Sequence, residues 1–322
     1  MLVNFHWRKF IVLSVAVFFI YGGFKYLVRG KKQKPDGISV SVRFSGRFGN
    51  HLFQYASLLG IARKNNMTAC VPSWLDLSSV FNIDMCDGDV RDFGAYVSYN
   101  EEMFAKFFPH FFKLPKQNTL LNGYLQSFKY FDFMKSEILQ NQFRFREKYQ
   151  LMANSFLQKL LTEHRKKQIN TKQSLVESLI KDGNADDHPV VVGIHVRRGD
   201  FVRGYTRGYS TPPLPYYYRA MNYFLRKYPK IIFVICSNDI VWCQDNLADE
   251  NIYFSGTKNV YVDFAILASC DHVILSSGTF SWWAGYLNKG IVVYYKDFPR
   301  PNSILEKSFN RKDYYPDSWI PL

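Results

Sequence analysis

Blocks of apolar residues alternate with amphipathic stretches through the second half of the chain. The runs at 190–196, 231–236, 272–275 and 291–295 are rich in β-branched and aromatic residues, and segments with helical spacing separate them. Uninterrupted apolar runs of this length are typical of strands that are buried on both faces, as in parallel sheets. Strands that alternate with helices in this way predict a parallel, right-handed βαβ domain.

The first half contains a similar unit. Residues 38–44 alternate in polarity and predict a strand, a glycine-containing turn follows, and apolar residues from Leu52 to Ala62 recur at helical spacing. Residues 119–124 favour a further strand, and residues 136–182 favour helix. The polar segment 181–188 is the expected boundary between two domains.

The N-terminal segment predicts a membrane anchor. No charged residue occurs from Phe10 to Phe24, and the apolar run continues past Lys25 to Val28, which is enough for a short transmembrane helix. A signal peptide is the alternative, although no cleavage site of the A-x-A type follows. More basic residues follow the span than precede it, so the positive-inside rule alone opposes an exported C-terminal domain.

Composition fits a globular protein with an excess of basic residues. The 322 residues are 47% apolar and 18% aromatic, which provides core material for two domains. Residues 1–36 hold seven Lys or Arg and one Asp, so they contribute +6 of the net charge of +14 and leave +8 for the rest. An acidic small substrate or an anionic membrane explains this charge as well as nucleic acid does. Because no nucleic-acid-binding motif is present, we expect no nucleic-acid partner.

The five cysteines lack the spacing of a zinc site. In an oxidising compartment the pairs nearest in sequence are Cys70 with Cys86 and Cys236 with Cys243, and buried free thiols are the alternative. The acidic segment at 87–89 spells the DxD metal-binding pattern, but its polar, glycine-containing surroundings favour a solvated turn. We therefore expect no metal site.

Polar side chains follow two of the predicted strands. The carboxyl ends of neighbouring parallel strands meet at the sheet edge where α/β folds bind their ligands. Adjacent arginines favour an anion with several oxygens, such as a diphosphate, and hydroxyl and amide groups at a helix N-terminus bind phosphate oxygens. Ordinary surface ion pairs are the alternative. The residues are His195, Arg197, Arg198 and Asp200 after the first strand, and Ser276, Ser277, Gly278 and Thr279 after the third.

Two other segments carry candidate ligand contacts. Gly46, Gly49 and Asn50 lie in the turn between a strand and a helix, where backbone amides point at an anion. This turn matches neither the P-loop nor the dinucleotide-binding pattern, and a simple tight turn is the alternative. Asp263 begins the helix before the serine turn. Its carboxylate is suited to accept two N–H bonds from a guanine edge, or it is simply an acidic residue favoured at a helix start.

Together, these stretches resemble the signature sequences of the α1,2-fucosyltransferases. The resemblance covers residues 38 to 296 in the same order, and three ordered motifs are specific where one would not be. The matching stretches are Phe44-x-Gly46-Arg47-x-Gly49-Asn50 leading into Gln54-Tyr55-Ala56, then His195-x-Arg197-Arg198-x-Asp200, then Val262-Asp263-Phe264-Ala265-x-Leu267, and finally Gly278-Thr279-Phe280-x-Trp282-Trp283-Ala284-x-Tyr286-Leu287.

The resemblance implies a Golgi type II membrane enzyme that transfers L-fucose from GDP-fucose to the 2-hydroxyl of a terminal galactose, with inversion and with no required metal or cofactor. The implied fold is α/β and GT-B-like, with two Rossmann-like parallel-sheet domains that face a cleft. The implied parts are a cytoplasmic tail (1–9), a transmembrane anchor (10–28), a short stem (29–37), an acceptor-side domain (38–185) and a GDP-fucose-binding domain (186–322). Another acceptor, as in protein O-fucosylation, and a non-catalytic glycan-binding module are the alternatives.

The resemblance also assigns roles within the donor site. Arg197 contacts the donor diphosphate, His195 and Asp263 address guanine, and the serine turn completes the phosphate pocket. The related α1,6-enzymes carry a glutamate base ten residues after the histidine, where this chain has Tyr205. The base therefore cannot be carried over, and Asp200 is the candidate, with bracing of Arg197 as its other possible role.

Further departures from the family pattern are His51, Ser281 and Gly285, which stand where Gln, Gly and Ala are usual. The single N-glycosylation sequon places a candidate glycan on Asn66, which a lumenal domain would carry.

Overall fold

The computed structural model describes residues 37–72, 74–83, 96–170 and 188–322. The expected tail, anchor and nearly all of the stem lie outside these residues, as do the DxD segment and most of the expected domain boundary. Among the described residues, no helix combines the length and the apolar character that a membrane crossing requires.

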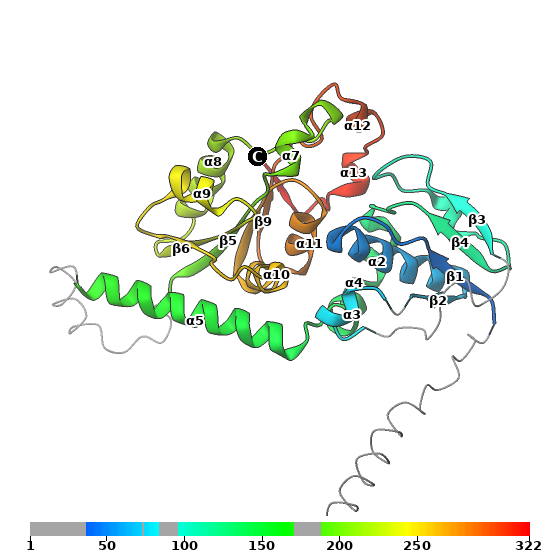
Figure 1. Cartoon of the computed structure of the whole chain (residues 1–322), viewed down its shortest axis with the longest axis horizontal. Coiled ribbons are helices and arrows are strands. Elements are labelled where there is room, and N and C mark those ends of the chain that lie inside the picture. The colour runs from blue at the N-terminus through cyan, green and yellow to red at the C-terminus, as the bar shows by residue number, and fades with distance from the viewer. Residues whose placement is uncertain (1–36, 73, 84–95, 171–187) are drawn as a thin grey trace, which may run out of the picture.

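Two sheets organise the fold, and all strand pairs within them are parallel (Figure 1). The first sheet has the order β2-β1-β4-β3 and the second has the order β10-β9-β8-β5-β6-β7. This confirms the α/β class, and the long apolar runs are the central strands of the second sheet. The strands are β1 (Ser39–Val42), β2 (Thr68–Cys70), β3 (Val97–Asn100), β4 (Thr119–Asn122), β5 (Val190–Val196), β6 (Ile231–Ser237), β7 (Ile252–Phe254), β8 (His272–Leu275), β9 (Val292–Tyr294) and β10 (Ile320–Pro321).

Helices cover both faces of the second sheet. Residues of α8 and α9 form one core with the side chains of Val192 and Ile194, and residues of α10 and α11 pack with Val191 on the opposite face (Figure 1). The α-helices are α2 (Phe48–Asn65), α3 (Leu77–Val80), α4 (Lys135–Glu137), α5 (Glu147–Asn170), α7 (Asp200–Arg203), α8 (Leu214–Leu225), α9 (Ile240–Leu247), α10 (Val260–Ser269), α11 (Thr279–Leu287), α12 (Ile304–Lys307) and α13 (Arg311–Tyr314), with short helical turns at Pro109–Phe112, Phe128–Tyr130, Asp132–Met134, Ile138–Gln142 and Tyr205–Arg207.

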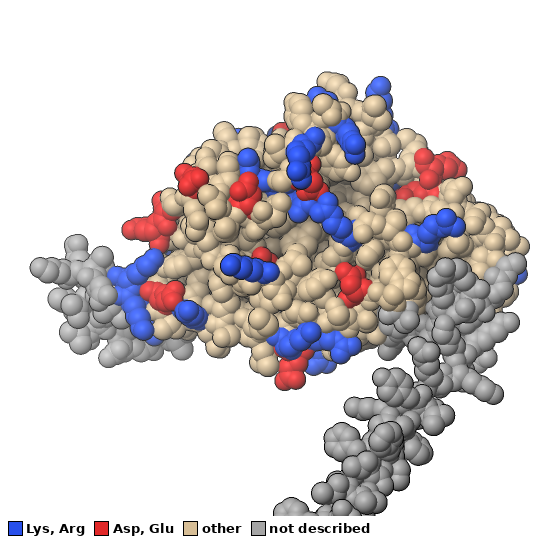
Figure 2. All heavy atoms as spheres, viewed as in Figure 1, with Lys and Arg blue, Asp and Glu red and all other residues tan. Residues whose placement is uncertain are grey.

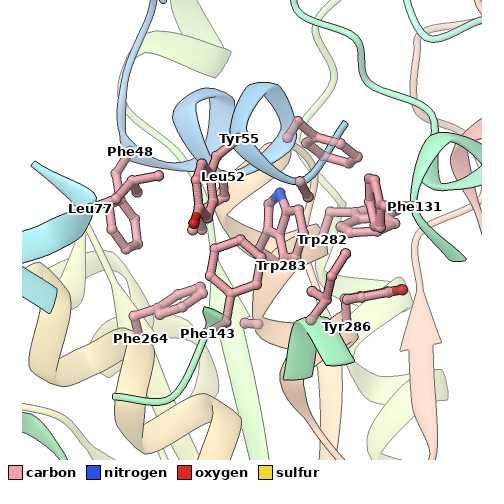
Figure 3. Close-up of a cluster of buried hydrophobic side chains, with 14 of the residues drawn as sticks. Phe48, Leu52, Tyr55, Leu77, Phe131, Phe143, Phe264, Trp282, Trp283 and Tyr286 are labelled. Carbon is pink, nitrogen blue, oxygen red and sulfur yellow. The ribbon is translucent and has the colours of Figure 1, made fainter. Parts of the chain in front are cut away.

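An aromatic core joins the two sheets. Side chains of α2 meet those of α11 there (Figure 3). The ring of Phe53 lies 4.4 Å from that of Trp282, and the ring of Phe131 stacks on Trp283 at 5.4 Å between centroids. Large buried aromatic rings contribute much of the apolar area that stabilises such a core, at roughly 25 cal/mol per Å². The turns that precede α2 and α11 are therefore held at a fixed distance from each other.

The helical prediction for residues 136–182 is only partly correct. A short helical segment ends at Gln142, and the chain then runs through a bridge between Phe145 and Phe81 before α5 begins. Burial of Phe143 between the two helical segments accompanies this break. Helix α5 packs along α10 of the second sheet, where Gln150 bonds to Ser269.

The second of the two cysteine pairs nearest in sequence does not form. Cys236 and Cys243 are both free and buried, because Cys236 faces the core around α10 while Cys243 lies in the core on the other side of the sheet. Cys70 is disulfide-bonded, and Cys86 lies outside the described residues.

Candidate active site

A cavity of about 360 Å³ lies where the first turn of α2 meets the carboxyl edge of the second sheet. Basic side chains gather along this junction, between α7 and the start of α2 (Figure 2). The wall combines charged, hydroxyl and aromatic groups from both halves of the described chain. Its residues are Arg47, Asn50, Phe104, Tyr124, Gln126, Arg197, Asp200, Phe201, Gly204, Arg207, Tyr209, Ser277, Gly278, Thr279, Phe280, Phe298 and Tyr314.

The two loop tips singled out in the sequence come together here. Strand β5 pairs directly with β8, and the Arg197 amide donates to the Ser276 hydroxyl at 3.1 Å. Gly278 has a φ of +94°, and a Cβ there would lie 2.8 Å from the Phe201 ring, so the turn requires glycine. Its left-handed backbone leads directly into the free amides at the start of α11, which are suited to anion oxygens.

A carboxylate lies between two guanidinium groups in the cavity. Asp200 accepts hydrogen bonds from Arg197 on one oxygen and from Arg47 on the other. Burial acts to raise the pKa of Asp200, but the charges of Arg197 and Arg47 lower it below its ordinary value. The carboxylate is therefore ionised at neutral pH and is a weak proton acceptor. This geometry favours the bracing role over the base role.

Gly49 and Asn50 fit the start of α2 against the start of α11. The Asn50 side-chain oxygen accepts hydrogen bonds from Thr279 at 3.1 Å and from Gln126 at 3.0 Å. A Cβ on Gly49 would lie 2.6 Å from the Phe280 amide nitrogen. Gly46 has a φ of +89° and lies behind Asn50. The motif thus has a packing role that links the two halves, and Asn50 itself lines the cavity.

Two predicted ligand contacts of the arginine motif point away from the cavity. The His195 ring is buried and bonds the Ser281 hydroxyl at 3.0 Å. Burial and the charge of Arg197 lower the His195 pKa to about 3, so the ring is neutral. Arg198 pairs with Asp239 and stacks on Trp242 at 3.9 Å. His195 lies within β5, whereas Arg198 lies two residues beyond the end of this strand.

The remaining predicted residues Asp263, Ser276 and Asn66 do not line the cavity. Asp263 accepts hydrogen bonds from Ser255 and Thr257, and burial raises its pKa above the ordinary value. Ser276 is buried beneath Arg197. Asn66 lies elsewhere, exposed at the end of α2 with a φ of +51°. No group of acidic, histidine or cysteine side chains suited to a metal occurs among the described residues.

Comparison with known proteins decides the family. The sequence model of glycosyl transferase family 11 matches residues 3–322. The chain belongs to this family. It is 27% identical to mouse galactoside 2-alpha-L-fucosyltransferase Sec1, over 88% of this chain and 73% of the relative. It is 28% identical to galactoside alpha-(1,2)-fucosyltransferase 2 of Pongo pygmaeus, over 86% of this chain and 77% of the relative.

Among solved structures, the crystal structure of POFUT1 in complex with GDP aligns with a TM-score of 0.50 at 12% identity, over 81% of this chain and 99% of that chain. This likeness supports the α/β fold with parallel sheets. The family assignment makes the chain a glycosyltransferase.

The cavity of this glycosyltransferase also contains residues that the sequence did not identify as candidate ligand contacts. Arg47 belongs to one of the motifs that resemble the family, and its positive charge beside a glycine-containing turn was the available signal of a role in ligand binding. Gln126 and Tyr314 carried no such signal, because neither belongs to a motif with a known chemistry.

Proposed function

We propose that this glycosyltransferase transfers L-fucose from GDP-fucose to the 2-hydroxyl of a terminal galactose, with inversion, in a GT-B-like arrangement whose acceptor side is residues 38–185 and whose donor side is residues 186–322. The names of the curated relatives support the transferred sugar and the acceptor. The observation that carries the proposal is the guanidinium of Arg197 beside the hydroxyl and amide groups of residues 277–279.

The diphosphate is the leaving group in this reaction, and fixed positive charge stabilises it. Arg197 and Arg47 approach the same point from opposite walls of the cavity, where Asp200 now lies between them. A donor diphosphate would compete with this carboxylate for both guanidiniums. A charge-assisted hydrogen bond contributes roughly 1.5–3 kcal/mol, and in a transition state with oxocarbenium character that energy lowers the barrier to departure.

The proposal requires neither a metal nor another cofactor, because the two guanidiniums and the α11 amides supply the positive field. The galactose hydroxyl must lose a proton, and Asp200 is poorly suited to take it since its pKa is lowered. We assign Asp200 to bracing Arg197.

We further propose a type II Golgi membrane location with a lumenal catalytic domain. Asn66 tests this directly, since it is exposed beside α2 and would carry a glycan in the lumen. A shift in electrophoretic mobility on endoglycosidase treatment of the cell-expressed chain, absent in Asn66→Gln, is the expected result. An unglycosylated chain that proteases reach from the cytosolic side would contradict the location.

The activity test uses the full chain in detergent with GDP-fucose, EDTA and an array of galactosides, followed by linkage analysis of the product. We expect an α1,2-linked fucosyl galactoside that forms in EDTA. Arg47→Ala should lower kcat/KM by at least about 10-fold. The matched control is Arg63→Ala, at the other end of α2, where Arg63 pairs with Glu137 at the surface. Transfer to protein hydroxyls instead, or equal effects of the two substitutions, would contradict the proposal.

A further inference from the structure

Two residues of the cavity wall, Gln126 and Tyr314, each carry a buried polar atom that the described part of the chain leaves without a hydrogen-bond partner. These atoms are the Gln126 Oε1 and the Tyr314 hydroxyl oxygen. The two residues are only 2% and 1% exposed. An unpaired buried polar group is energetically costly, so such atoms are rare and mark places where a partner is missing.

Gln126 lies two hydrogen bonds away from the turn that we assign to the diphosphate. Its side-chain nitrogen donates to Asn50, and the same Asn50 oxygen accepts from Thr279, the first residue of α11. The donor side of the Gln126 amide is therefore used, and the acceptor side is free. Gln126 and residues 277–279 thus line the same cavity, in which a group attached to the diphosphate would lie.

The wall holds Gln126 in a fixed position. One carboxylate oxygen of Glu101 accepts the backbone N–H groups of Tyr124 at 2.8 Å and Leu125 at 3.1 Å. Leu125 is fully buried and has a φ of +51°. The turn that leads into Gln126 is thus anchored, so Gln126 belongs to a preorganised wall.

Tyr314 is equally constrained. Its carbonyl accepts the Trp282 indole N–H at 2.7 Å, and its ring packs against Phe309 at 4.7 Å between centroids. The hydroxyl of Tyr314 is the part of this packed residue without a partner among the described residues.

Aromatic side chains alternate with charged and hydroxyl groups in the rest of the wall; the aromatic ones are Phe104, Tyr124, Phe201, Tyr209, Phe280 and Phe298. A small cavity that combines apolar surfaces with fixed polar groups suits a compact ligand with hydroxyl groups. We propose that Gln126 and Tyr314 bind hydroxyl groups of the sugar carried by the nucleotide diphosphate and so determine which donor sugar the glycosyltransferase accepts. This inference rests on the proposed function, because that function places the diphosphate at residues 277–279.

The test uses full-length Tyr314→Phe and Gln126→Met, with GDP and GDP-fucose as the probes. GDP lacks the sugar, so its binding constant should stay within about twofold of wild type. The kcat/KM for GDP-fucose should fall by at least about 10-fold, and discrimination against GDP-mannose should shrink, because sugar hydroxyls lose their partners. The Tm of Tyr314→Phe should be unchanged or higher, since an unpaired polar atom is removed.

Tyr286→Phe is the matched control. Tyr286 also packs on Trp282 (Figure 3), but its hydroxyl is paired with Asp132 at 3.3 Å and lies outside the cavity. This variant should lose some stability and keep the wild-type preference between donors. A structural role for Tyr314 would instead make the two tyrosine variants behave alike.

The outcomes separate this inference from the proposed function. If wild type uses GDP-fucose and both cavity variants keep its donor preference, the inference is overturned and the function stands. If wild type does not use GDP-fucose, the proposed donor is wrong, and thermal shifts with a panel of nucleotide sugars and their diphosphates replace the kinetic comparison. The inference then fails if no nucleotide sugar stabilises wild type more than its diphosphate, or if that gain survives both substitutions.

Discussion

Glu101 makes the stability of this protein depend on pH. Its carboxylate supports the turn at residues 123–126, and its second oxygen is buried without a partner among the described residues. Burial raises the pKa of Glu101 from 4.5 to about 7, against the backbone hydrogen bonds that lower it. The folded protein therefore keeps a proton on Glu101 in a pH range where the unfolded chain has already released it.

The sign and size of the effect follow from this difference. The stabilising contribution is complete below pH 4.5 and is lost as the pH rises towards 7. The difference in pKa corresponds to about 3 kcal/mol in total, of which about 2 kcal/mol falls between pH 5.5 and 8. Glu101→Gln keeps the shape and an acceptor for the turn but carries no charge. Its stability relative to wild type should therefore increase by about 2 kcal/mol over that range.

Thermal and denaturant unfolding at pH 5.5 and pH 8 measure this change. Glu163→Gln is the control, because Glu163 is exposed on α5 and pairs with Lys159 at the surface. If the difference in unfolding free energy between wild type and Glu101→Gln stays constant from pH 5.5 to pH 8, the reasoning is refuted. An equal change in the Glu163→Gln control would refute it as well.

Substitutions at three other residues probe the cavity and the contact between the helix starts beside it. Arg197→Lys should lower kcat/KM by at least about 10-fold and Arg197→Ala by about 100-fold, because a point charge cannot form the paired bonds of a guanidinium; wild-type turnover in the lysine variant would count against the clamp. Gly49→Ala should lower the free energy of unfolding by about 1–3 kcal/mol through the contact of its Cβ with α11, and an unchanged denaturation midpoint would show that the two helix starts are not tightly fitted. Asp200→Asn should reduce activity but retain the shape of the pH–rate profile, whereas loss of the acidic limb would restore the base role.

The central strands and the two loop tips could be predicted from the sequence because both signals are local. The run at 190–196 is apolar or small at every position except His195, a pattern typical of a strand that is buried on both faces. The abrupt change to charged and hydroxyl residues then indicates the sheet edge. Pairing of β5 with β8 brings those tips together as expected.

The direction of individual side chains was a weaker prediction. His195 and Arg198 were expected to contact the donor, but the His195 ring bonds Ser281 of α11 and Arg198 lies against Asp239 and Trp242. Because Arg198 follows the end of β5, the loop and not the alternation of the strand sets its direction. The helical prediction for residues 136–182 was only partly correct for a different reason. Burial of Phe143 by residues distant in the chain interrupts a segment whose own pattern is otherwise helical.

The sequence alone determined the fold class, the four central strands of the second sheet and the arginine and serine motifs, because each depends on neighbouring residues in the chain. Only the tertiary structure decided that Arg47 reaches Asp200 across 153 positions and that Gln126 and Tyr314 share a wall with the phosphate turn. These contacts depend on how the aromatic core fixes α2 against α11. Packing between distant segments leaves no periodic signal in either segment, so the contact of Arg47 with Asp200 and the positions of the unpaired polar atoms could not be assigned before the fold was known.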